Sequence, residues 1–267
     1  MEGQKVTFVD RNAGGNPSRL PALATELIRT TPDVIFARGP AAVAAVARAT
    51  RTTPIVAVDL ESDPLALGYA KTLARPGGNV TGVFLDFPEL SAKQLQLIQE
   101  IVPGLSRLAL LGDLTGNAAQ FRAAERAAQA LGIETQRIEI RIASDVDAGL
   151  ETAQRSRVGA ILIFSSPLVF TQGAHIAAVA RDKRLPTVSI FGQFAESGGL
   201  LTYGPNLRES FRRCGVYVGK ILNGTKSADL PIERPQKFEL VINTKTAKAL
   251  NLTVPPSLVL RADRIVE

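Results

Sequence analysis

The sequence predicts an α/β protein made of two doubly wound parallel-sheet lobes joined by a hinge. Short apolar segments alternate with segments of helical period along all 267 residues. Several apolar segments are continuous runs of Val, Ile, Leu and Phe, which is typical of parallel strands covered on both faces. The two halves of the chain also look like similar α/β units, and no low-complexity linker separates them.

Strands are expected wherever a short apolar run is bounded by turn residues. The segments with this character are 6–10, 33–37, 55–58, 80–85, 107–111, 134–140, 160–164, 187–190, 200–203 and 238–242. The run 74–82 carries a proline and three glycines, which suit a sharp turn between two such strands. The two lobes are expected to join just after it, near residues 83–88.

Helices are expected between the strands, because apolar residues recur there with a period of three to four. Ser18 is the expected N-cap of the first helix, and Gly132 is a typical residue just beyond a helix end. The predicted helices cover residues 18–30, 41–49, 90–102, 117–131, 147–156, 171–183, 207–223 and 245–250.

Composition excludes several classes of protein. Hydrophobic residues make up 45% and charged residues 21%, as in ordinary globular proteins. The net charge of +6 comes from scattered Lys and Arg, so no nucleic-acid partner is expected. No run of 18 apolar residues predicts a membrane span, and the first residues lack the apolar core of a signal peptide.

The residues available for catalysis are few. A single cysteine, Cys214, excludes an internal disulfide, and with one histidine, His175, a Cys/His zinc site is excluded as well. His175 is expected in the first turn of a helix, in a surface or capping role. No phosphate-binding loop, dinucleotide fingerprint or nucleophile elbow is present. These observations favour binding over catalysis, with no cofactor and no metal.

Candidate binding residues follow the predicted strands, because ligands of open parallel sheets bind beyond the carboxyl ends of the strands. Arg38, Gly39, Pro40 and Ala41 lead from one strand into a helix. Their amides and the helix dipole suit a carboxylate, to which the Arg38 guanidinium adds two donors. The alternative is an ordinary helix start with proline at its first position.

Acidic residues follow the next two strands. Asp59 begins a run with Glu61 and Asp63, and Asp86 follows the strand after it. Such carboxylates suit the ammonium group of a ligand. The alternative for the run is a solvated loop in which Asp63 caps a helix.

The second half of the chain places hydroxyls and aromatic rings after its strands. Ser165 and Ser166 follow one strand, Phe191 follows another, and Tyr203 ends a third. Together with the acidic residues they suit a small polar organic molecule with an apolar part. Phe191 and Tyr203 are equally consistent with the core.

Motifs spread over nearly the whole chain resemble those of one family. The stretches are Arg-Leu-Pro-Ala-Leu-Ala at 19–24, Asp-Pro-Leu-Ala-Leu-Gly at 63–68, Leu-Ala-Arg-Pro-Gly-Gly-Asn-Val-Thr-Gly at 73–82, Glu-Leu-Ser-Ala-Lys-Gln-Leu at 89–95, Gly-Gly-Leu-Leu-Thr-Tyr-Gly-Pro-Asn at 198–206 and Lys-Phe-Glu-Leu-Val-Ile-Asn at 237–243. Further matches are 246–250, 255–258 and 262–263. In this order they resemble the ABC-transporter substrate-binding proteins, a family that includes binders of tryptophan and other aromatic amino acids.

The resemblance implies a type I periplasmic-binding fold in which two lobes close on a ligand held between them. It places lobe 1 at residues 1–84 plus about 204–228, and lobe 2 at 85–203 plus about 229–267. It also implies a monomer in the periplasm that delivers its ligand to a membrane permease. The chain departs from the family's usual sequence in two places, and both are expected to affect the binding site or the first lobe. Arg38-Gly39-Pro40 stands where the family usually has Gly-Thr-Pro, and the signal and about 30 residues forming a first strand and helix are missing before Gly3.

The function expected is therefore binding of a small organic solute, an amino acid or an aromatic carboxylate, for import. One alternative is a ligand-sensing module of the same fold, since fold does not fix function. Another is an α/β enzyme acting on a small carboxylate, which would need a base and a nucleophile beyond what His175 offers.

Overall fold

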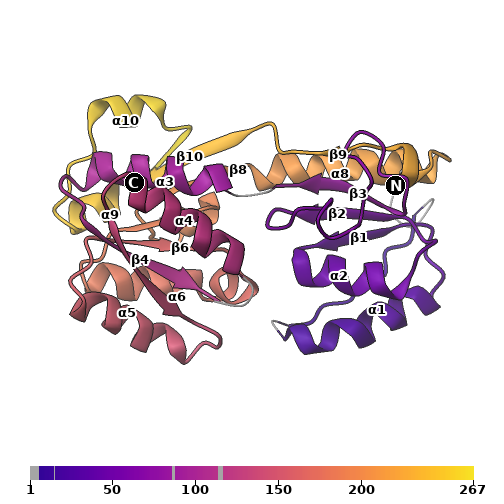
Figure 1. Ribbon diagram of the computed structural model, residues 1–267, viewed down its shortest axis with the longest axis horizontal. Helices are drawn as coiled ribbons and strands as arrows, with labels where there is room; N and C mark the ends of the chain where they lie inside the picture. Colours follow the sequence, from indigo (N-terminus) through magenta and orange to yellow (C-terminus); the bar gives the residue numbers. More distant parts are fainter. Residues whose placement is uncertain (1–5, 15, 86–87, 114–116) are drawn as a thin grey trace. The chain divides into compact units, whose positions relative to one another are not determined.

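The computed structural model describes residues 6–14, 16–85, 88–113 and 117–267 (Figure 1). The chain forms two compact units. Unit 1 consists of Met1–Asp86 and Leu207–Pro235, and unit 2 of Phe87–Asn206 and Gln236–Glu267. The chain thus passes from one unit to the other between residues 86 and 87, 206 and 207, and 235 and 236.

Unit 1 is built on a four-stranded sheet whose strands are all parallel. Continuous apolar runs form its central strands, and every residue of β2 and β3 is buried. This is the pattern of a parallel sheet with helices on both faces. In spatial order the strands are β1 (Ile35–Arg38), β2 (Ile55–Asp59), β3 (Val80–Phe84) and β9 (Ile232–Glu233).

Helices cover both faces of this sheet (Figure 1). On one face, Val43 and Val46 pack in a cluster with Ile55 and Ala57 of β2. On the other face, Tyr217 is fully buried and its hydroxyl donates to the carbonyl of Pro231 over 2.8 Å. The helical elements of unit 1 are η1 (Pro17–Arg19), α1 (Leu20–Arg29), α2 (Pro40–Ala49), α8 (Leu207–Leu222) and η2 (Ser227–Asp229).

Unit 2 is built on a seven-stranded sheet in which β8 and β10 are antiparallel and all other neighbours are parallel. In spatial order the strands are β11 (Arg264–Val266), β10 (Phe238–Asn243), β8 (Leu201–Pro205), β7 (Thr187–Ser189), β6 (Ala160–Ile163), β4 (Arg107–Gly112) and β5 (Glu134–Glu139).

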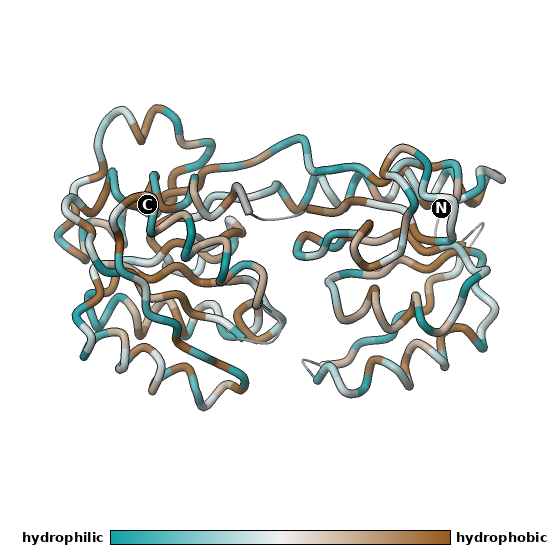
Figure 2. Tube along the Cα trace, viewed as in Figure 1, coloured by the Kyte–Doolittle hydropathy of each residue, from teal (hydrophilic) through white to brown (hydrophobic). Residues whose placement is uncertain are grey.

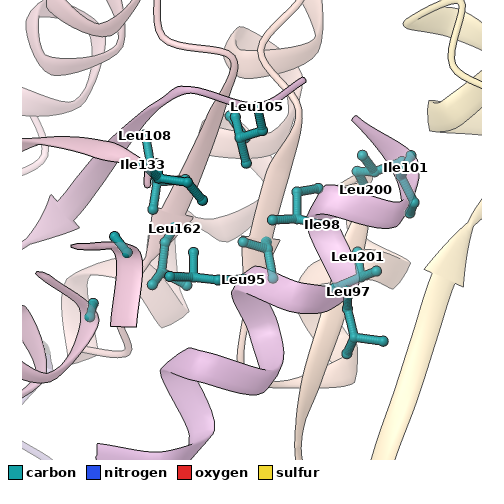
Figure 3. Packing of buried hydrophobic residues seen from close by; sticks show 14 of the residues in the cluster. Leu95, Leu97, Ile98, Ile101, Leu105, Leu108, Ile133, Leu162, Leu200 and Leu201 are labelled. Atoms are coloured by element: carbon teal, nitrogen blue, oxygen red, sulfur yellow. The ribbon is translucent and has the colours of Figure 1, made fainter. Parts of the chain in front are cut away.

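Successive residues of the central strands of unit 2 enter two different cores, as the alternation of side chains in a strand requires. Leu108 and Leu110 pack with α3 and α4, whereas Ala109 and Leu111 pack with α5 and α6. Figure 3 shows the first core, with Leu95 of α3 directed toward the strands. The helices of unit 2 are α3 (Pro88–Ile101), α4 (Ala118–Ala130), α5 (Asp145–Arg155), α6 (Pro167–Asp182), α7 (Gly192–Glu196), α9 (Thr244–Ala249) and α10 (Pro256–Arg261).

Apolar residues concentrate along the strands inside each unit (Figure 2). In the described part of the chain, no helix is both long enough and apolar enough to cross a membrane.

Most predicted strands are present, but the prediction of a strand at residues 6–10 is wrong. Only Val6 makes an isolated bridge there, while Phe8 is 73% and Val9 43% exposed. An alternation of apolar residues forms a strand only where a neighbour pairs with its backbone groups. The sequence analysis also missed β9 and β11, α7 and α10, and the antiparallel pairing of β8 with β10.

Two helix starts differ from expectation. The side chain of Asn16, not Ser18, caps the first helical turn by accepting from the Ser18 amide. Helix α6 begins at Pro167, because the Ser166 hydroxyl accepts from the Val169 amide over 3.1 Å. His175 therefore lies in mid-helix, where its Nε2 is 2.7 Å from an Asp147 carboxylate oxygen at the surface.

One glycine sets how closely two central strands of unit 1 approach. Gly82 of β3 pairs with Ala57 of β2 and has φ of +131°, in the region that favours glycine. A Cβ at this position would lie 2.1 Å from the Ala57 carbonyl oxygen. The local spacing of the sheet therefore requires glycine here.

We expect Gly82→Ala to lower the free energy of unfolding by about 3 kcal/mol or more, since it adds both a backbone clash and strain. Gly215→Ala on α8 is the control, because a Cβ there meets open space. It should leave stability unchanged or raise it by up to about 1 kcal/mol through helix propensity. Urea unfolding of both variants checks this, and equal stability of the two would contradict it.

Candidate functional site

Three strands of unit 1 end at one edge of its sheet. Parallel pairing places Arg38 opposite Val58, and Asp59 opposite Phe84. The residues that follow β1 and β2 are therefore neighbours at this edge, which is the edge at which open parallel sheets bind ligands.

The start of α2 offers fewer free amides than the sequence suggested. Gly39 has φ of +81°, and its N–H donates to the Val58 carbonyl over 2.8 Å. Pro40 has no N–H. The amides of Ala41 and Ala42 remain at the positive end of the helix, where no carbonyl of the helix reaches them. The predicted anion site at residues 38–41 thus keeps the exposed Arg38 and the Ala41 amide, but not the Gly39 amide.

Asp59 at the end of β2 is an incompletely satisfied buried carboxylate. Its side chain is fully buried, and its Oδ1 accepts from the Glu61 amide over 3.1 Å. Its Oδ2 has no hydrogen-bond partner among the described residues. Burial raises the pKa of Asp59, and hydrogen bonds from Ser62 and from the Glu61 amide oppose this only in part.

An unpaired buried carboxylate oxygen is costly, so a cation or hydrogen-bond donor from outside would improve the site. Tyr69 lies near it, with its ring centroid 6.3 Å from that of Phe84. Burial, and then the charge of Asp59, raise the pKa of the Tyr69 hydroxyl. Sequence reasoning missed Tyr69, which stands in an irregular segment and follows no predicted strand.

The other acidic residues of this region take different roles. Asp63 Oδ1 accepts from the Leu65 amide over 2.8 Å, so its side chain closes a local turn. The alternative of a capping role for Asp63 therefore fits, with a turn in place of the helix. Asp86 lies outside the described residues.

Unit 2 carries two small adjoining cavities where β6 and β7 end. The first, of about 20 Å³, is lined by apolar residues and by four polar ones, Ser91, Gln94, Gln120 and Ser165, for which it is called the polar cavity below. The second, of about 80 Å³, is mainly apolar and is called the aromatic cavity below, because Phe170, Phe191 and Phe194 are among its lining residues. Ser165 and Ile190 border both cavities.

Buried amide side chains hold the polar cavity in place. Asn117 Nδ2 donates to the Ser165 carbonyl over 3.0 Å and contacts Gln120 Oε1. Gln94 Nε2 donates to the Tyr203 carbonyl over 2.8 Å. The sequence analysis missed these three residues, because polar residues on an amphipathic helix ordinarily indicate its exposed face.

The candidates of unit 2 divide accordingly. Ser165 and Phe191 line the cavities, as a ligand-binding role requires. The Ser166 hydroxyl is engaged in capping α6. Tyr203 lines neither cavity, and its ring stacks on Phe238 with centroids 5.9 Å apart and packs against the core.

The arrangement suits binding by hydrogen bonds, charge and apolar contact. Burial raises the pKa of the Cys214 thiol to about 12, which keeps it protonated and unreactive. In the part of the chain that the structure describes, no group of three or more His, Cys, Asp or Glu residues could hold a metal ion.

Comparison with known proteins places this arrangement in a family. The sequence profile of the ABC transporter substrate binding proteins matches residues 1–266. The chain belongs to this family. Its members are extracytoplasmic substrate-binding proteins of ABC transporters, not enzymes.

The chain is similar to several known proteins and solved structures. A tyrosine-binding protein of Clostridioides difficile strain R20291 is 21% identical over 253 residues, which are 94% of this chain and 72% of that protein. An ABC domain of Streptococcus pneumonia solved in complex with L-Trp has a TM-score of 0.90 and 22% identity, over 99% of this chain and 89% of that one. A conserved domain protein of Vibrio cholerae has a TM-score of 0.91 and 24% identity, over 99% and 88%. These likenesses confirm the predicted type I periplasmic-binding fold.

The buried Asp59 carboxyl should make stability depend on pH. Its pKa is raised in the folded state, so its favourable contribution is complete below the unfolded value of about 3.9 and is lost as pH rises through the folded pKa. Without ligand, Asp59→Asn should therefore gain stability relative to wild type as pH increases from about 4 to 7. Urea unfolding at several pH values measures this difference, and parallel curves for the two proteins would contradict it.

Proposed function

We propose that this protein is the solute-binding component of an ABC importer and binds an amino acid or a small aromatic carboxylate. It works in the periplasm as a monomer, and it holds the solute between its two units. It delivers the solute to a membrane permease. The support comes from the family and from the residues at the carboxyl ends of the strands in each unit.

The observation that carries the proposal is the unpaired Oδ2 of Asp59. This oxygen is fully buried and belongs to the last residue of β2, at the edge of the sheet where open parallel sheets bind their ligands. The ammonium group of an amino acid would supply both the charge and the N–H donors that the site lacks. Its binding would also favour the ionised form of Asp59 and so offset the cost of burial. Asp86 stays a candidate for the same role.

The carboxylate of the solute would lie at the start of α2. The amides of Ala41 and Ala42 face outward from the helix end, and Arg38 precedes them at the same sheet edge. Arg38 pairs with Val58, so its side chain leaves the sheet on the face opposite to that of Asp59, because successive strand residues alternate between faces. The start of α2, which packs on the face of Ile55 and Ala57, is on the same face as Asp59. An α-amino acid has the opposite charges one carbon apart, which suits such neighbouring groups.

Unit 2 would supply the remaining contacts. Ser165 and the buried amides of Gln94 and Gln120 offer hydrogen-bond donors and acceptors, and Phe191 offers an aromatic face. Tyr203 stays a candidate, although its ring already stacks on Phe238. The printed names of two relatives, a tyrosine-binding protein and a domain solved with L-Trp, support an amino acid as the solute class.

Asp59→Asn should bind an amino acid at least tenfold more weakly than wild type while remaining folded. Loss of one charge-assisted hydrogen bond in a buried site corresponds to about 1.5–3 kcal/mol. Isothermal titration of the full chain with a panel of amino acids and aromatic acids measures this. The matched control is Asp63→Asn, because the Asp63 side chain already accepts from the Leu65 amide.

The proposal fails if wild type binds no member of this panel, or if Asp59→Asn and Asp63→Asn bind with the affinity of wild type. Binding by wild type should also stabilise the folded protein. At a ligand concentration of 100 Kd, the free energy of unfolding should rise by about 2.7 kcal/mol, and the unfolding midpoint should rise with it. Ligand binding without stimulation of any permease would favour the sensing module instead.

A further inference from the structure

The aromatic cavity of unit 2 has the features of a side-chain pocket. It lies where β7 ends, between α6 and α7, and its volume is about 80 Å³. The cavity opens to solvent, so it is a pocket at the surface and not a void in the core. Its place at the ligand edge of the sheet and its mainly apolar lining suit the apolar part of a bound molecule.

The position of the cavity links it to the polar groups already described. Ser165 and Ile190 border both this cavity and the polar cavity lined by Gln94 and Gln120. A molecule with its polar part beside the amides would thus direct its apolar part into the cavity that Phe191 and Phe194 line. Half-exposed Phe170 stands at the same cavity and leaves its mouth accessible to solvent.

One glycine limits the size of the cavity. Gly173 is a buried residue of α6 that lines it, and a Cβ at this position would lie 3.7 Å from Phe194 Cδ2, an ordinary contact. The helix itself does not require glycine, because Gly173 has ordinary helical φ and alanine has the higher helix propensity. The missing side chain keeps space open in front of Phe194.

We infer that this cavity receives the apolar side chain of the solute, and that Gly173 and Phe194 set its size limit. The inference rests on the proposed function and narrows it to amino acids with a compact apolar group, a branched aliphatic chain or a single ring. An apolar cavity of about 150 Å³ holds a benzene molecule. A space of about 80 Å³ with an open mouth therefore accommodates a leucine side chain, or part of one ring, but not an indole.

The test is isothermal titration of the full chain with L-leucine, L-phenylalanine, L-tryptophan and L-alanine. Wild type should bind leucine or phenylalanine more tightly than tryptophan. Gly173→Val fills the cavity and should weaken binding of the preferred one by about tenfold or more, as expected when a buried aliphatic group is excluded. Binding of alanine should change little. Gly173→Ala should give a smaller loss in the same direction.

The matched control is Ala174→Val, which adds the same β-branched side chain to the neighbouring exposed position of α6. Its affinities should equal those of wild type, and thermal unfolding verifies that each variant is folded. Tighter binding of tryptophan, or unchanged affinity in both Gly173 variants, overturns the inference and leaves the proposed function standing. Failure of wild type to bind any amino acid or aromatic acid overturns both.

Discussion

The pairing of β2 with its two parallel neighbours is the constraint on which the proposed site of unit 1 depends. β2 is buried along its whole length, and Gly82 lets β3 approach Ala57 more closely than any side chain would permit. This close register ends with Asp59 opposite Phe84, so the carboxyl group is held at the sheet edge and shielded from water. The sheet therefore fixes both the position and the raised pKa of this carboxyl.

Burial of Asp59 lowers the stability of the free protein and at the same time favours binding of the proposed ligand. In the free protein an ionised carboxylate with an unpaired oxygen opposes folding, since a buried charge without a partner is unfavourable. The same property makes the site selective, because a ligand without a hydrogen-bond donor cannot relieve that cost, and a cationic donor relieves it more than a neutral one. A residue that destabilises the free protein and is satisfied by its ligand is expected where binding is the selected property.

Strands that are continuous apolar runs could be predicted from the sequence. Strand formation could be predicted less well in short segments, where it depends on whether a neighbouring strand pairs with the segment. β9 and β11 have two and three residues, too few to show a period, and segment 6–10 has strand-like residues without forming a strand. The sequence could select Asp59, Ser165 and Phe191 as candidates because they stand at or just after strand ends, and strand ends are visible in the sequence. The unpaired Oδ2 of Asp59, the engaged Gly39 amide and the buried amides of Gln94, Asn117 and Gln120 depend on tertiary contacts that no local pattern encodes.

The most direct test of the account follows the protonation of Asp59 by NMR, using its side-chain carboxyl carbon in the free protein and in the presence of a bound amino acid. The account predicts a pKa above the ordinary range for Asp in the free protein and a lower pKa in the complex, because the ammonium group stabilises the ionised carboxylate. An Asp59 pKa that does not change while the amino acid binds would contradict the central claim that this carboxylate receives the cationic group of the solute.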